Sequence, residues 1–506
     1  MTIPVLSATQ AAAWDSVART QFRIPSRLLM ETAGRAVAQV LIREFPDARA
    51  RGTLIVAGAG NNGGDGWVLA RALHAAHWRV SVAGLDPKTD DAIDNRALAR
   101  TDGVHELAEG EPWPAAALVV DALLGTGAAG PARGDVLELA QRVATFGAPI
   151  LAVDGPTGLD LTSGEAHGPV SAAVTVTFGG PRRGHLLARD WCGKIVVVDI
   201  GFPPHDEALP RLVTDAGAGF RLPRLTPAMQ KGDRGRVTVI GGATGMTGAA
   251  LHAARAALGA GAGLVKLVAG KETIEAARTS LPDVLTVESA LGKELEPAVG
   301  EAVDWADAIV VGPGLGREPE RGAFLRAVLG RRVMPTVLDA DALGLAELKG
   351  DRPLVLTPHL GEFRRVAGDA LADEAANDRW SAATKAAQKL KATVLLKGVP
   401  TVIADLRGPP LVVASGNPGL ATGGSGDLLA GFIGAFLARG AAPSEAAALG
   451  AHALGRAADI AAGQWTARSL RPADVLAALP TLWRAWSDVK PWDPPVIAVL
   501  DAPEVA

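Results

Sequence analysis

Short apolar runs alternate with helical patterns in two successive series along this chain of 506 residues. The runs of the first series lie at residues 53–57, 79–83, 117–121, 150–154, 173–178 and 194–200. Those of the second series lie at residues 236–240, 263–268, 308–311, 336–339, 354–357, 393–397 and 401–404. Such runs, separated by helices, are typical of parallel sheets that helices cover on both faces. The sequence therefore predicts an α/β chain with two doubly wound sheets, whose functional groups lie at the carboxyl ends of the strands.

Between the two series lies a stretch of low periodicity that contains Pro203, Pro204, Pro210, Pro223 and Pro227. We interpret this stretch as a linker, because clustered prolines break helices and strands. One domain is therefore expected at residues 1–212 and a second at residues 220–487. The proline-containing tail from Lys490 is predicted to be an appendage.

The bulk composition excludes several classes of protein. Apolar residues make up 48% of the chain, which is enough to bury sizeable cores, and the net charge of −4 gives no basic face for nucleic acid. With Cys192 as the single cysteine, the chain has neither an internal disulfide nor a cysteine-based zinc cluster. The N-terminus does not resemble a signal peptide, and the longest strongly apolar helical run, 428–438, is too short to span a bilayer. We expect a cytoplasmic protein that binds small molecules, not membranes.

A glycine-rich loop, GAGNNGGDG, follows the first strand. Gly58, Gly60 and Gly63 match the G-x-G-x-x-G pattern of dinucleotide-binding loops, and Asp86 follows the next strand, where a ribose-binding acid would lie. Glycines allow a pyrophosphate to approach the backbone, and the helix N-terminus favours an anion. A nicotinamide-dependent dehydrogenase is therefore an alternative, although no second domain offers a site for hydride acceptance.

The same loop carries more polar groups than a dinucleotide fingerprint needs. Asn61, Asn62 and Asp65 add amide and carboxylate oxygens, which bind hard cations or a polar ring. The alternative is a turn that only caps the next helix. Two more strand ends converge on the loop in a parallel sheet, one with Asp121 and one with Asp154 and Thr157. This convergence favours a functional site.

The motifs LMETAG, GAGNNGGDG, DALLGTG and DGPTG, in this order, resemble the nicotinamide-hydrate epimerase family of the YjeF N-terminal type, over residues 5–202. The resemblance implies a Rossmann-like fold and a bound potassium ion with ligands from Asn62, Asp121 and Thr157, the last replacing the usual serine. The substrate contacts that it implies are Asn61, Asn62, Gly63, Gly64, Asp65, Gly125, Thr126, Gly127, Ala128, Ala129, Gly130, Pro131 and Asp154.

Epimerisation inverts a carbon that bears a hydroxyl and a ring nitrogen, so a carboxylate has to give and take protons. We predict that Asp154 is this catalytic residue. Lys88 resembles a lysine that some family members have near this position; the alternative is a solvated loop lysine. A non-catalytic binding module is disfavoured, because Asn62, Asp121 and Asp154 are all intact.

The second half contains the run NPGLATGGSGDLLAG, a glycine-rich loop that opens an apolar helix. The backbone amides from Gly423 to Gly426 are expected to be free at the helix N-terminus, where they would bind an anion. Asp427 lies beside them and is placed to take a proton from an attacking hydroxyl. The alternative is a carboxylate that only complements the helix dipole. The chain contains no GxxxxGK[ST] loop, so it is not a P-loop enzyme.

Further polar residues follow other strands of the second series. Asp339 and Asp341 end one strand, His359 and Glu362 follow the next, and Lys397 ends a third. Taken singly, such a histidine is usually structural and such a lysine is usually a surface charge. Their shared position at strand ends favours one site.

The motifs KGDRGRV, GPGLG, DADAL, TPHLGEF, KGVPT and NPGLATGGSGDLLAG resemble the ADP/ATP-dependent nicotinamide-hydrate dehydratase family, over residues 220–465. The resemblance implies a ribokinase-like fold. The substrate contacts that it implies are Ala249, Gly314, His359 and Asp427, and the nucleotide contacts are Lys397, Gly398, Val399, Pro400, Thr401 and Gly426. The sequence departs from the family at Gln230, Leu360 and Ser425, none of which removes an acid or an amide.

Together the two resemblances imply a bifunctional repair enzyme for hydrated NADH and NADPH. The first domain would interconvert the R and S epimers. In the second, Asp427 would remove the proton of the C6 hydroxyl of the S form, and the alkoxide would attack the terminal phosphate of ADP or ATP with Mg²⁺. Loss of phosphate then restores the reduced nicotinamide. A homo-oligomer is expected. The alternative is a ribokinase-like small-molecule kinase with an accessory N-terminal domain, which would leave a stable phosphorylated product.

Overall fold

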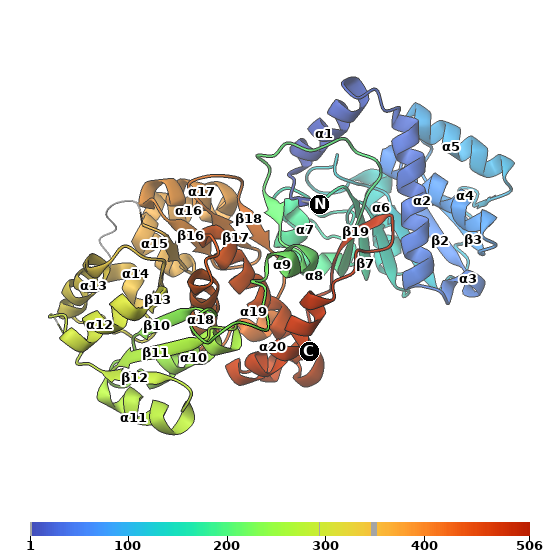
Figure 1. The fold of residues 1–506 in the computed structure, drawn as a ribbon. Coiled ribbons are helices and arrows are strands. Elements are labelled where there is room, and N and C mark those ends of the chain that lie inside the picture. Colours follow the sequence, from blue (N-terminus) through green and yellow to red (C-terminus); the bar gives the residue numbers. More distant parts are fainter. Residues whose placement is uncertain (1–2, 293, 346–351, 506) are drawn as a thin grey trace. The chain divides into compact units, whose positions relative to one another are not determined.

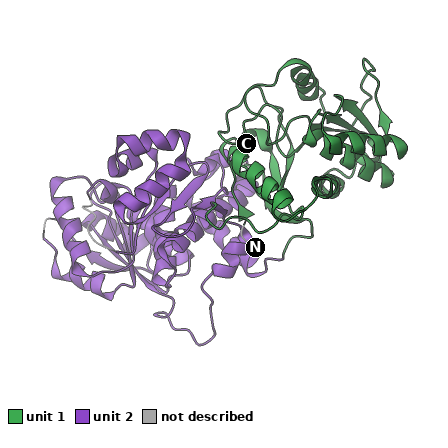
Figure 2. Cartoon of the chain, turned by 90° about the horizontal axis from the view of Figure 1, so that it is seen from above, with its two compact units in different colours: residues 1–209, 491–503 green, residues 210–490, 504–506 purple. Residues whose placement is uncertain are grey.

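The structure, a computed structural model, describes residues 3–292, 294–345 and 352–505. The chain forms two compact units (Figure 2). Unit 1 comprises residues 1–209 and 491–503, and unit 2 contains residues 210–490. Each unit has its own sheet and helices (Figure 1). Within the described residues, no helix is long and apolar enough to cross a bilayer.

Unit 1 is built on an eight-stranded sheet with the order β19-β8-β7-β6-β5-β2-β3-β4. Every pairing is parallel except that of β19 with β8. The central strands are buried at every residue, which explains their continuous apolar runs. The strands are β2 (Thr53–Ala57), β3 (Val80–Gly84), β4 (His105–Glu106), β5 (Leu118–Ala122), β6 (Ile150–Val153), β7 (Val174–Phe178), β8 (Lys194–Val198) and β19 (Val496–Leu500).

Successive residues of β2 enter two separate apolar cores, one on each face of the sheet. Ile55 belongs to the core shared with Leu41 and Leu73, whereas Leu54 belongs to the core shared with Val143. Helix α2 packs against α4, and α4 packs against α5 (Figure 1). The other elements of unit 1 are β1 (Ile3–Pro4), α1 (Ala8–Thr20), α2 (Ser26–Glu44), α3 (Ala48–Arg51), α4 (Asn61–Ala75), α5 (Asp90–Thr101), α6 (Gly134–Ala144), α7 (Arg183–Leu187) and α8 (Arg189–Cys192).

The C-terminal tail is part of the sheet of unit 1. Strand β19 pairs antiparallel with β8, and both Val496 and Ala498 are buried. The interpretation of this tail as an appendage is therefore wrong, because the tail completes an edge that β8 would otherwise expose.

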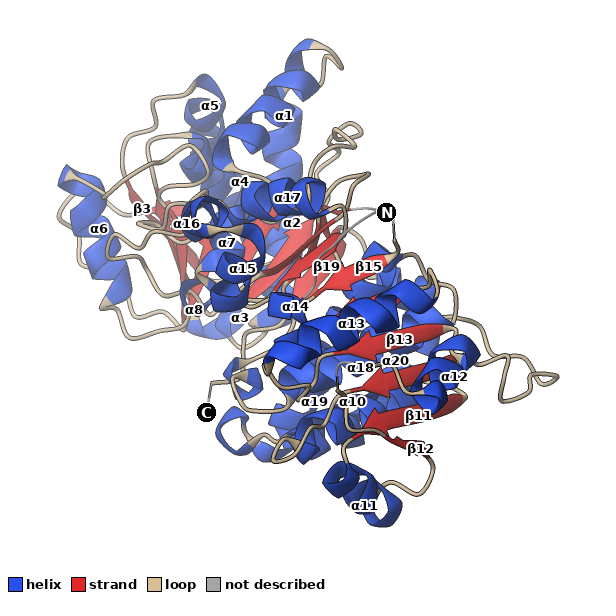
Figure 3. Ribbon diagram, turned by 90° about the vertical axis from the view of Figure 1, so that its left-hand side faces the viewer, coloured by secondary structure: helices blue, strands red, loops and turns tan. Residues whose placement is uncertain are grey.

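Unit 2 contains a larger sheet in which β9, β18, β17, β16, β15, β14, β13, β10, β11 and β12 follow one another. The pairs from β12 to β16 are parallel, and β17 is antiparallel to both of its neighbours. Figure 3 shows β13, β11 and β12 beside α12 (Pro297–Trp305), α10 (Thr247–Gly259) and α18 (Ser425–Ala438). The strands are β9 (Arg211–Leu212), β10 (Arg236–Ile240), β11 (Leu264–Ala269), β12 (Leu285–Glu288), β13 (Ala308–Val311), β14 (Thr336–Leu338), β15 (Leu354–Leu356), β16 (Thr393–Leu396), β17 (Thr401–Ala404) and β18 (Leu411–Val413).

Helix α18 (Ser425–Ala438) is the central helix of unit 2, and it is buried at every residue from Leu428 to Leu437. It packs against α10, β10 and β13, which explains why its sequence is apolar on all sides. The other helices are α9 (Asp215–Arg221), α10 (Thr247–Gly259), α11 (Lys271–Ser280), α12 (Pro297–Trp305), α13 (Pro319–Arg331), α14 (Asp341–Leu345), α15 (Leu360–Ala367), α16 (Asp369–Asn377), α17 (Arg379–Leu390), η1 (Pro418–Leu420), α19 (Pro443–Trp465), η2 (Ala467–Ser469) and α20 (Pro472–Ser487).

The proline-rich stretch contains two elements of unit 2 and is not all linker. Strand β9 pairs with β18, and α9 is anchored through Asp215. Asp215 Oδ1 accepts a hydrogen bond from Trp486 Nε1 at 3.1 Å and lies 2.8 Å from His452 Nε2. The linker interpretation failed here because a two-residue strand and a seven-residue helix are too short to show periodicity.

The α/β class with two mainly parallel sheets is confirmed. In each sheet the strand order reverses beside the first parallel strand, since β2 lies between β3 and β5, and β10 lies between β11 and β13. Such reversal points open a crevice at the carboxyl ends of the strands, where α/β proteins bind ligands. The glycine-rich loops that follow β2 and β10 lie at these two points.

Candidate functional sites

A buried pair of side chains joins two strand ends of unit 1. Asp121, in β5, accepts hydrogen bonds from the Thr157 backbone amide to Oδ2 and from Thr157 Oγ1 to Oδ1, both at 2.8 Å. Thr157 Oγ1 in turn accepts a hydrogen bond from the Leu124 amide at 3.1 Å. Burial raises the pKa of Asp121, although the bonds from Thr157 oppose this shift. A buried carboxylate of this kind favours a cation nearby.

Asn62 and Asp154 approach each other across Gly125. A Cβ atom at position 125 would lie 2.9 Å from Asp154 Oδ2 and 3.0 Å from Asn62 Oδ1, so a larger residue would displace these side chains. Asn62 Nδ2 is buried, and no described residue gives it a hydrogen-bond partner. The structure thus brings the first glycine-rich loop and two strand ends to one place, as the sequence predicts.

Asp154 follows β6 in a left-handed conformation with φ of 64°, which is unfavourable for a residue other than glycine. Its carboxylate accepts four hydrogen bonds: from the Thr126 amide at 2.7 Å, Thr126 Oγ1 at 2.5 Å, Thr177 Oγ1 at 3.3 Å and Arg182 Nη2 at 3.3 Å. Burial raises the pKa of Asp154, but the Arg182 charge and the Thr126 hydrogen bonds outweigh burial and lower it. Asp154 is therefore held as an anion.

Arg182 is a site residue that the sequence did not reveal. Its guanidinium is buried and donates through Nε to Thr126 Oγ1, through Nη1 to the carbonyls of Phe178 and Gly180, and through Nη2 to Asp154. A guanidinium has five N–H groups, so one on Nη2 has no partner among the described residues. An arginine in a loop without a motif carries no signal in one sequence.

A cavity of about 570 Å³ opens above these residues, within the usual size range of small-molecule sites. Of the predicted contacts, it is lined by Asn61, Asn62, Asp65, Gly125, Thr126, Gly127, Ala128 and Asp154. Gly63 and Gly64 are buried inside α4 instead, and Ala129, Gly130 and Pro131 do not line the cavity. Asp121 and Thr157 do not line it either and are fully buried.

One wall of the cavity comes from α1 and α2, which the sequence did not assign to the site. The lining residues from these helices include Asp15, Arg19, Ser26 and Met30. Met30 also packs on Gly64, where a Cβ atom would lie 2.6 Å from its methyl carbon. An apolar helix face next to a site looks the same in sequence as one that only packs in a core.

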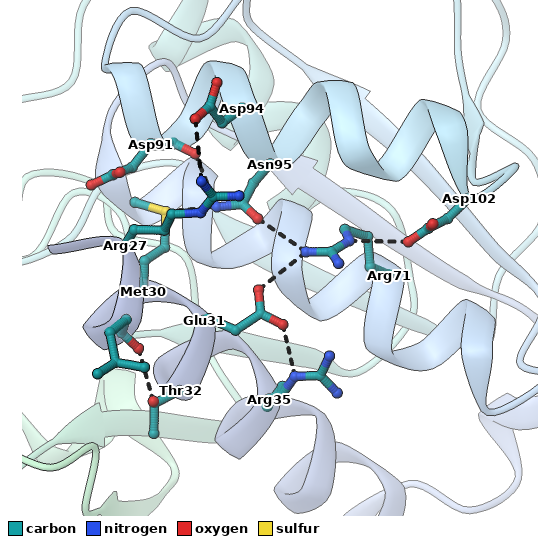
Figure 4. Close-up of polar contacts among 11 residues, drawn as sticks. Arg27, Met30, Glu31, Thr32, Arg35, Arg71, Asp91, Asp94, Asn95 and Asp102 are labelled. Carbon is teal, nitrogen blue, oxygen red and sulfur yellow. Dashed lines mark hydrogen bonds and ion pairs between the residues drawn. The ribbon is translucent and has the colours of Figure 1, made fainter. Parts of the chain in front are cut away.

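A polar network fixes α2, α4 and α5 to one another (Figure 4). Arg71 Nη1 donates to Glu31 Oε2 and to the buried Asn95 Oδ1, both at 3.1 Å, and Arg71 Nε donates to Asp102 at 3.1 Å. Asn95 Nδ2 lies 3.3 Å from the sulfur of Met30. The network therefore holds the cavity wall at Met30 in place.

Asp86, the expected ribose-binding acid of a dehydrogenase, and Lys88, a candidate for the epimerase site, both lie outside the lining of the cavity. The Asp86 side chain is 88% exposed and pairs with Arg96 at 2.6 Å, so it is not a ribose-binding acid. Lys88 is exposed and does not line the cavity. The fingerprint after β2 therefore lacks the acid that a dehydrogenase needs.

In unit 2, side chains from three neighbouring strand ends form one cluster. Lys397, after β16, lies 3.2 Å from Asp339 Oδ1, after β14, and 3.6 Å from Glu362 Oε2. Thr357 Oγ1, after β15, donates to Asp339 at 2.6 Å. Burial lowers the pKa of Lys397, but the charges of Asp339 and Glu362 outweigh burial and raise it. The sequence predicted this convergence.

The N-terminus of α18 presents free backbone amides. In the described part of the chain, no carbonyl or side chain accepts a hydrogen bond from the amides of residues 423–427. Gly424 has a φ of 100°, a conformation suited to glycine. A Cβ atom at Gly426 would lie 3.6 Å from Lys397 Nζ, so the lysine reaches the first turn of α18. This arrangement suits an anion.

Asp427 lies in the first turn of α18, next to these amides. Burial and the charge of Asp339 raise the pKa of Asp427 to about 7, against the opposing effect of Lys397. The side chain is partly exposed. A carboxylate with such a pKa is matched to proton transfer near neutral pH.

The remaining predicted contacts of unit 2 lie in three places. Ala249, on α10, is beside Gly314, since a Cβ atom at Gly314 would lie 3.3 Å from the Ala249 methyl carbon. His359 caps α15 by accepting from the Gly361 amide at 3.0 Å, and its side chain is exposed. The segment from Lys397 to Thr401 is held by Arg379, which donates to the carbonyls of Lys397 and Val399.

Both units match known protein families. The model described as YjeF-related protein N-terminus matches residues 26–184, and the model described as NAD(P)H-hydrate dehydratase matches residues 237–481. A bifunctional NAD(P)H-hydrate repair enzyme from Moorella thermoacetica is 37% identical over 95% of this chain and 96% of its own. The corresponding Escherichia coli protein is 35% identical over 89% of this chain and 88% of its own.

A solved structure of the ADP/ATP-dependent NAD(P)H-hydrate dehydratase from Bacillus subtilis, co-crystallised with ATP/Mg²⁺, is 29% identical. It covers 54% of this chain and 97% of its own, with a TM-score of 0.48. Fold and sites define a two-domain α/β enzyme with one candidate site in each unit. This chain belongs to the family of bifunctional NAD(P)H-hydrate repair enzymes.

Replacing Arg182 with Met is expected to destabilise unit 1 by about 3–5 kcal/mol, because it leaves the buried Asp154 carboxylate without its charge partner. Amide hydrogen exchange in β6 and β7 measures this loss, and the amides of α18 provide an internal reference. Arg133→Met, at an exposed position, is the matched control. Unchanged protection of β6 and β7 in the Arg182 variant would show that Asp154 does not depend on this guanidinium.

Proposed function

We propose that this chain repairs hydrated NADH and NADPH. Unit 1 interconverts the R and S epimers, and unit 2 dehydrates the S form at the expense of ADP or ATP. The observation that carries the proposal is the row of free amides at the N-terminus of α18 with Asp427 beside it and Lys397 opposite. Phosphoryl transfer needs a cradle of donors and a group that accepts the proton of the attacking hydroxyl.

In unit 2, Asp427 takes the proton of the C6 hydroxyl, and the resulting alkoxide attacks the terminal phosphate of the nucleotide. The amides of residues 423–426 and Lys397 stabilise the negative charge that develops on the phosphoryl oxygens. Departure of phosphate is easier than departure of hydroxide, which explains the need for a nucleotide. Mg²⁺, when bound, neutralises charge on the nucleotide phosphates, and Asp339 and Glu362 are the nearby carboxylates suited to orient it.

In unit 1, the residues fit a monovalent cation. Asn62, Asp121 and Thr157 offer an amide, a carboxylate and a hydroxyl oxygen, and no described cationic side chain pairs with the buried Asp121 carboxylate. We propose that potassium binds these three residues and Asp154 contacts the nicotinamide ring.

Product analysis tests the proposal. Purified protein is mixed with hydrated NADH, Mg²⁺ and ADP or ATP, and the phosphorus species are followed by NMR. The proposal expects inorganic phosphate and reduced cofactor to appear in equal amounts. A stable phosphorylated product without reduced cofactor would identify a small-molecule kinase instead.

The pH dependence of the dehydratase is expected to follow Asp427. Because the carboxylate acts as a base, kcat/KM should fall about tenfold per pH unit below its pKa of about 7 and level off above it. Asp339→Asn removes a charge that raises this pKa, so the midpoint should move to lower pH. An unchanged midpoint in the Asp339 variant would show that the pH profile does not report the titration of Asp427.

A further inference from the structure

Two carboxylates line the cavity of unit 1 in opposite surroundings. Asp154 accepts four hydrogen bonds, one of them from the Arg182 guanidinium. Asp65, one helical turn into α4, accepts none from any described residue. The pKa of Asp65 is well above its ordinary value, because of burial and then the negative charges of Asp154 and Asp15. When the surroundings shift the pKa values of two neighbouring acids in opposite directions, one acid is protonated and the other is ionised.

The four hydrogen bonds also limit what Asp154 can do. An ionised carboxylate offers about four lone-pair sites, and here each is matched by a donor from the protein. To take a proton, Asp154 would have to break one of these bonds and weaken its pair with Arg182. The Asp65 carboxyl has no such bonds to break, and it faces the cavity.

We propose that Asp65 is the catalytic residue that carries the proton in epimerisation, and that Asp154 is the fixed anion beside the reacting ring. This inference rests on the proposed function of unit 1 and divides between two residues the roles that the sequence assigned to Asp154 alone. Asn61 and Asn62, from the same turn of α4, hold the substrate against Asp65.

The Asp65 carboxyl donates its proton to the C6 hydroxyl, the C6–O bond breaks, and water leaves. The ring nitrogen supplies its electron pair to C6, which becomes planar and cationic, and the Asp154 carboxylate stabilises this charge. Water then adds to the opposite face of C6 and gives its proton to the Asp65 carboxylate. The products are the other epimer and a recharged Asp65.

Asp65→Asn tests the proposal, since the amide keeps the shape of the carboxyl group but cannot transfer a proton. The expected result is a fall in epimerase kcat of about 10²- to 10⁴-fold with little change in KM. Thermal stability should not fall, because a neutral amide replaces a neutral carboxyl. Wild-type hydrogen-exchange protection of β6 and β7 shows that unit 1 of the variant is folded, and the dehydratase activity of unit 2 normalises the protein concentration. Asp94→Asn, on the exposed face of α5, is the matched control.

Heavy-oxygen water gives the second readout. Each inversion by this step exchanges the C6 oxygen with solvent, so the wild-type protein should label both epimers. An Asp65→Asn protein that epimerises at the wild-type rate, or inversion without label, would overturn the inference. If the wild-type protein itself does not epimerise, the proposed function of unit 1 fails, and this outcome is distinct from the other two.

Discussion

Asp427→Asn is expected to lower the dehydratase kcat by about 10²- to 10⁴-fold, the usual contribution of a positioned proton acceptor. The amide cannot take the proton of the C6 hydroxyl, while the free amides of α18 and Lys397 still bind phosphate. Nucleotide affinity should therefore change little. The return of the absorbance of the reduced nicotinamide, with S-form substrate and saturating nucleotide, measures the effect.

Glu445→Gln is the matched control for Asp427, because Glu445 also lies in the first turn of a helix, α19, but is exposed and pairs with Arg221. This variant should retain the wild-type rate. If Asp427→Asn kept a rate near that of the wild-type protein, the carboxylate would only complement the helix dipole, and another group would accept the proton.

Asp154→Asn is expected to lower the epimerase rate by about 10²- to 10³-fold, the usual cost of removing one preorganised electrostatic group. The dehydratase site would remain intact. A mixture of epimers supplied with nucleotide would then be converted only to the extent of its S fraction, and the R fraction would remain. The measurement is the final amplitude of the absorbance change, corrected for spontaneous epimerisation without protein.

The folding of unit 1 has to be followed separately, because a misfolded unit 1 would also leave the R epimer behind. Native hydrogen-exchange protection of β6 and β7 together with a remaining R fraction would show that Asp154 is catalytic and not only structural. Complete conversion by Asp154→Asn at the wild-type rate would show that Asp154 takes no part in the reaction and only pairs with Arg182.

The sequence predicted the groups that meet at strand ends. Asp121, Asp154 and Thr157 in unit 1, and Asp339 and Lys397 in unit 2, converge because the carboxyl ends of parallel strands share one edge of a sheet. The local pattern of each strand was enough, because a strand buried on both faces leaves a continuous apolar run.

Groups fixed by tertiary packing alone were not predictable. Arg182 reaches Asp154 from the loop after β7, and its role depends on which carbonyls and hydroxyls surround it. Met30 looks like any core methionine until α2 is placed against Gly64. Strand β19 pairs with a strand that lies far away in the sequence, and no local signal encodes that pairing.

His359 shows a different limit. The sequence predicted a substrate contact, and in the structure its ring caps α15 through the amides of Gly361 and Glu362. A histidine that caps a helix and a histidine that contacts the substrate look alike in the sequence, because both would follow the same strand end. A capping residue at the edge of a site can also serve both roles. Comparing ligand binding by His359→Asn and by the wild-type protein separates the two roles.

Mixing two variants shows whether one chain holds two separate sites that act in sequence. Asp154→Asn protein has an intact dehydratase, and Asp427→Asn protein has an intact epimerase. Added together to a mixture of epimers with nucleotide and Mg²⁺, they should convert the whole mixture, whereas neither does so alone. Conversion that stops at the level reached by Asp154→Asn protein alone would contradict the account.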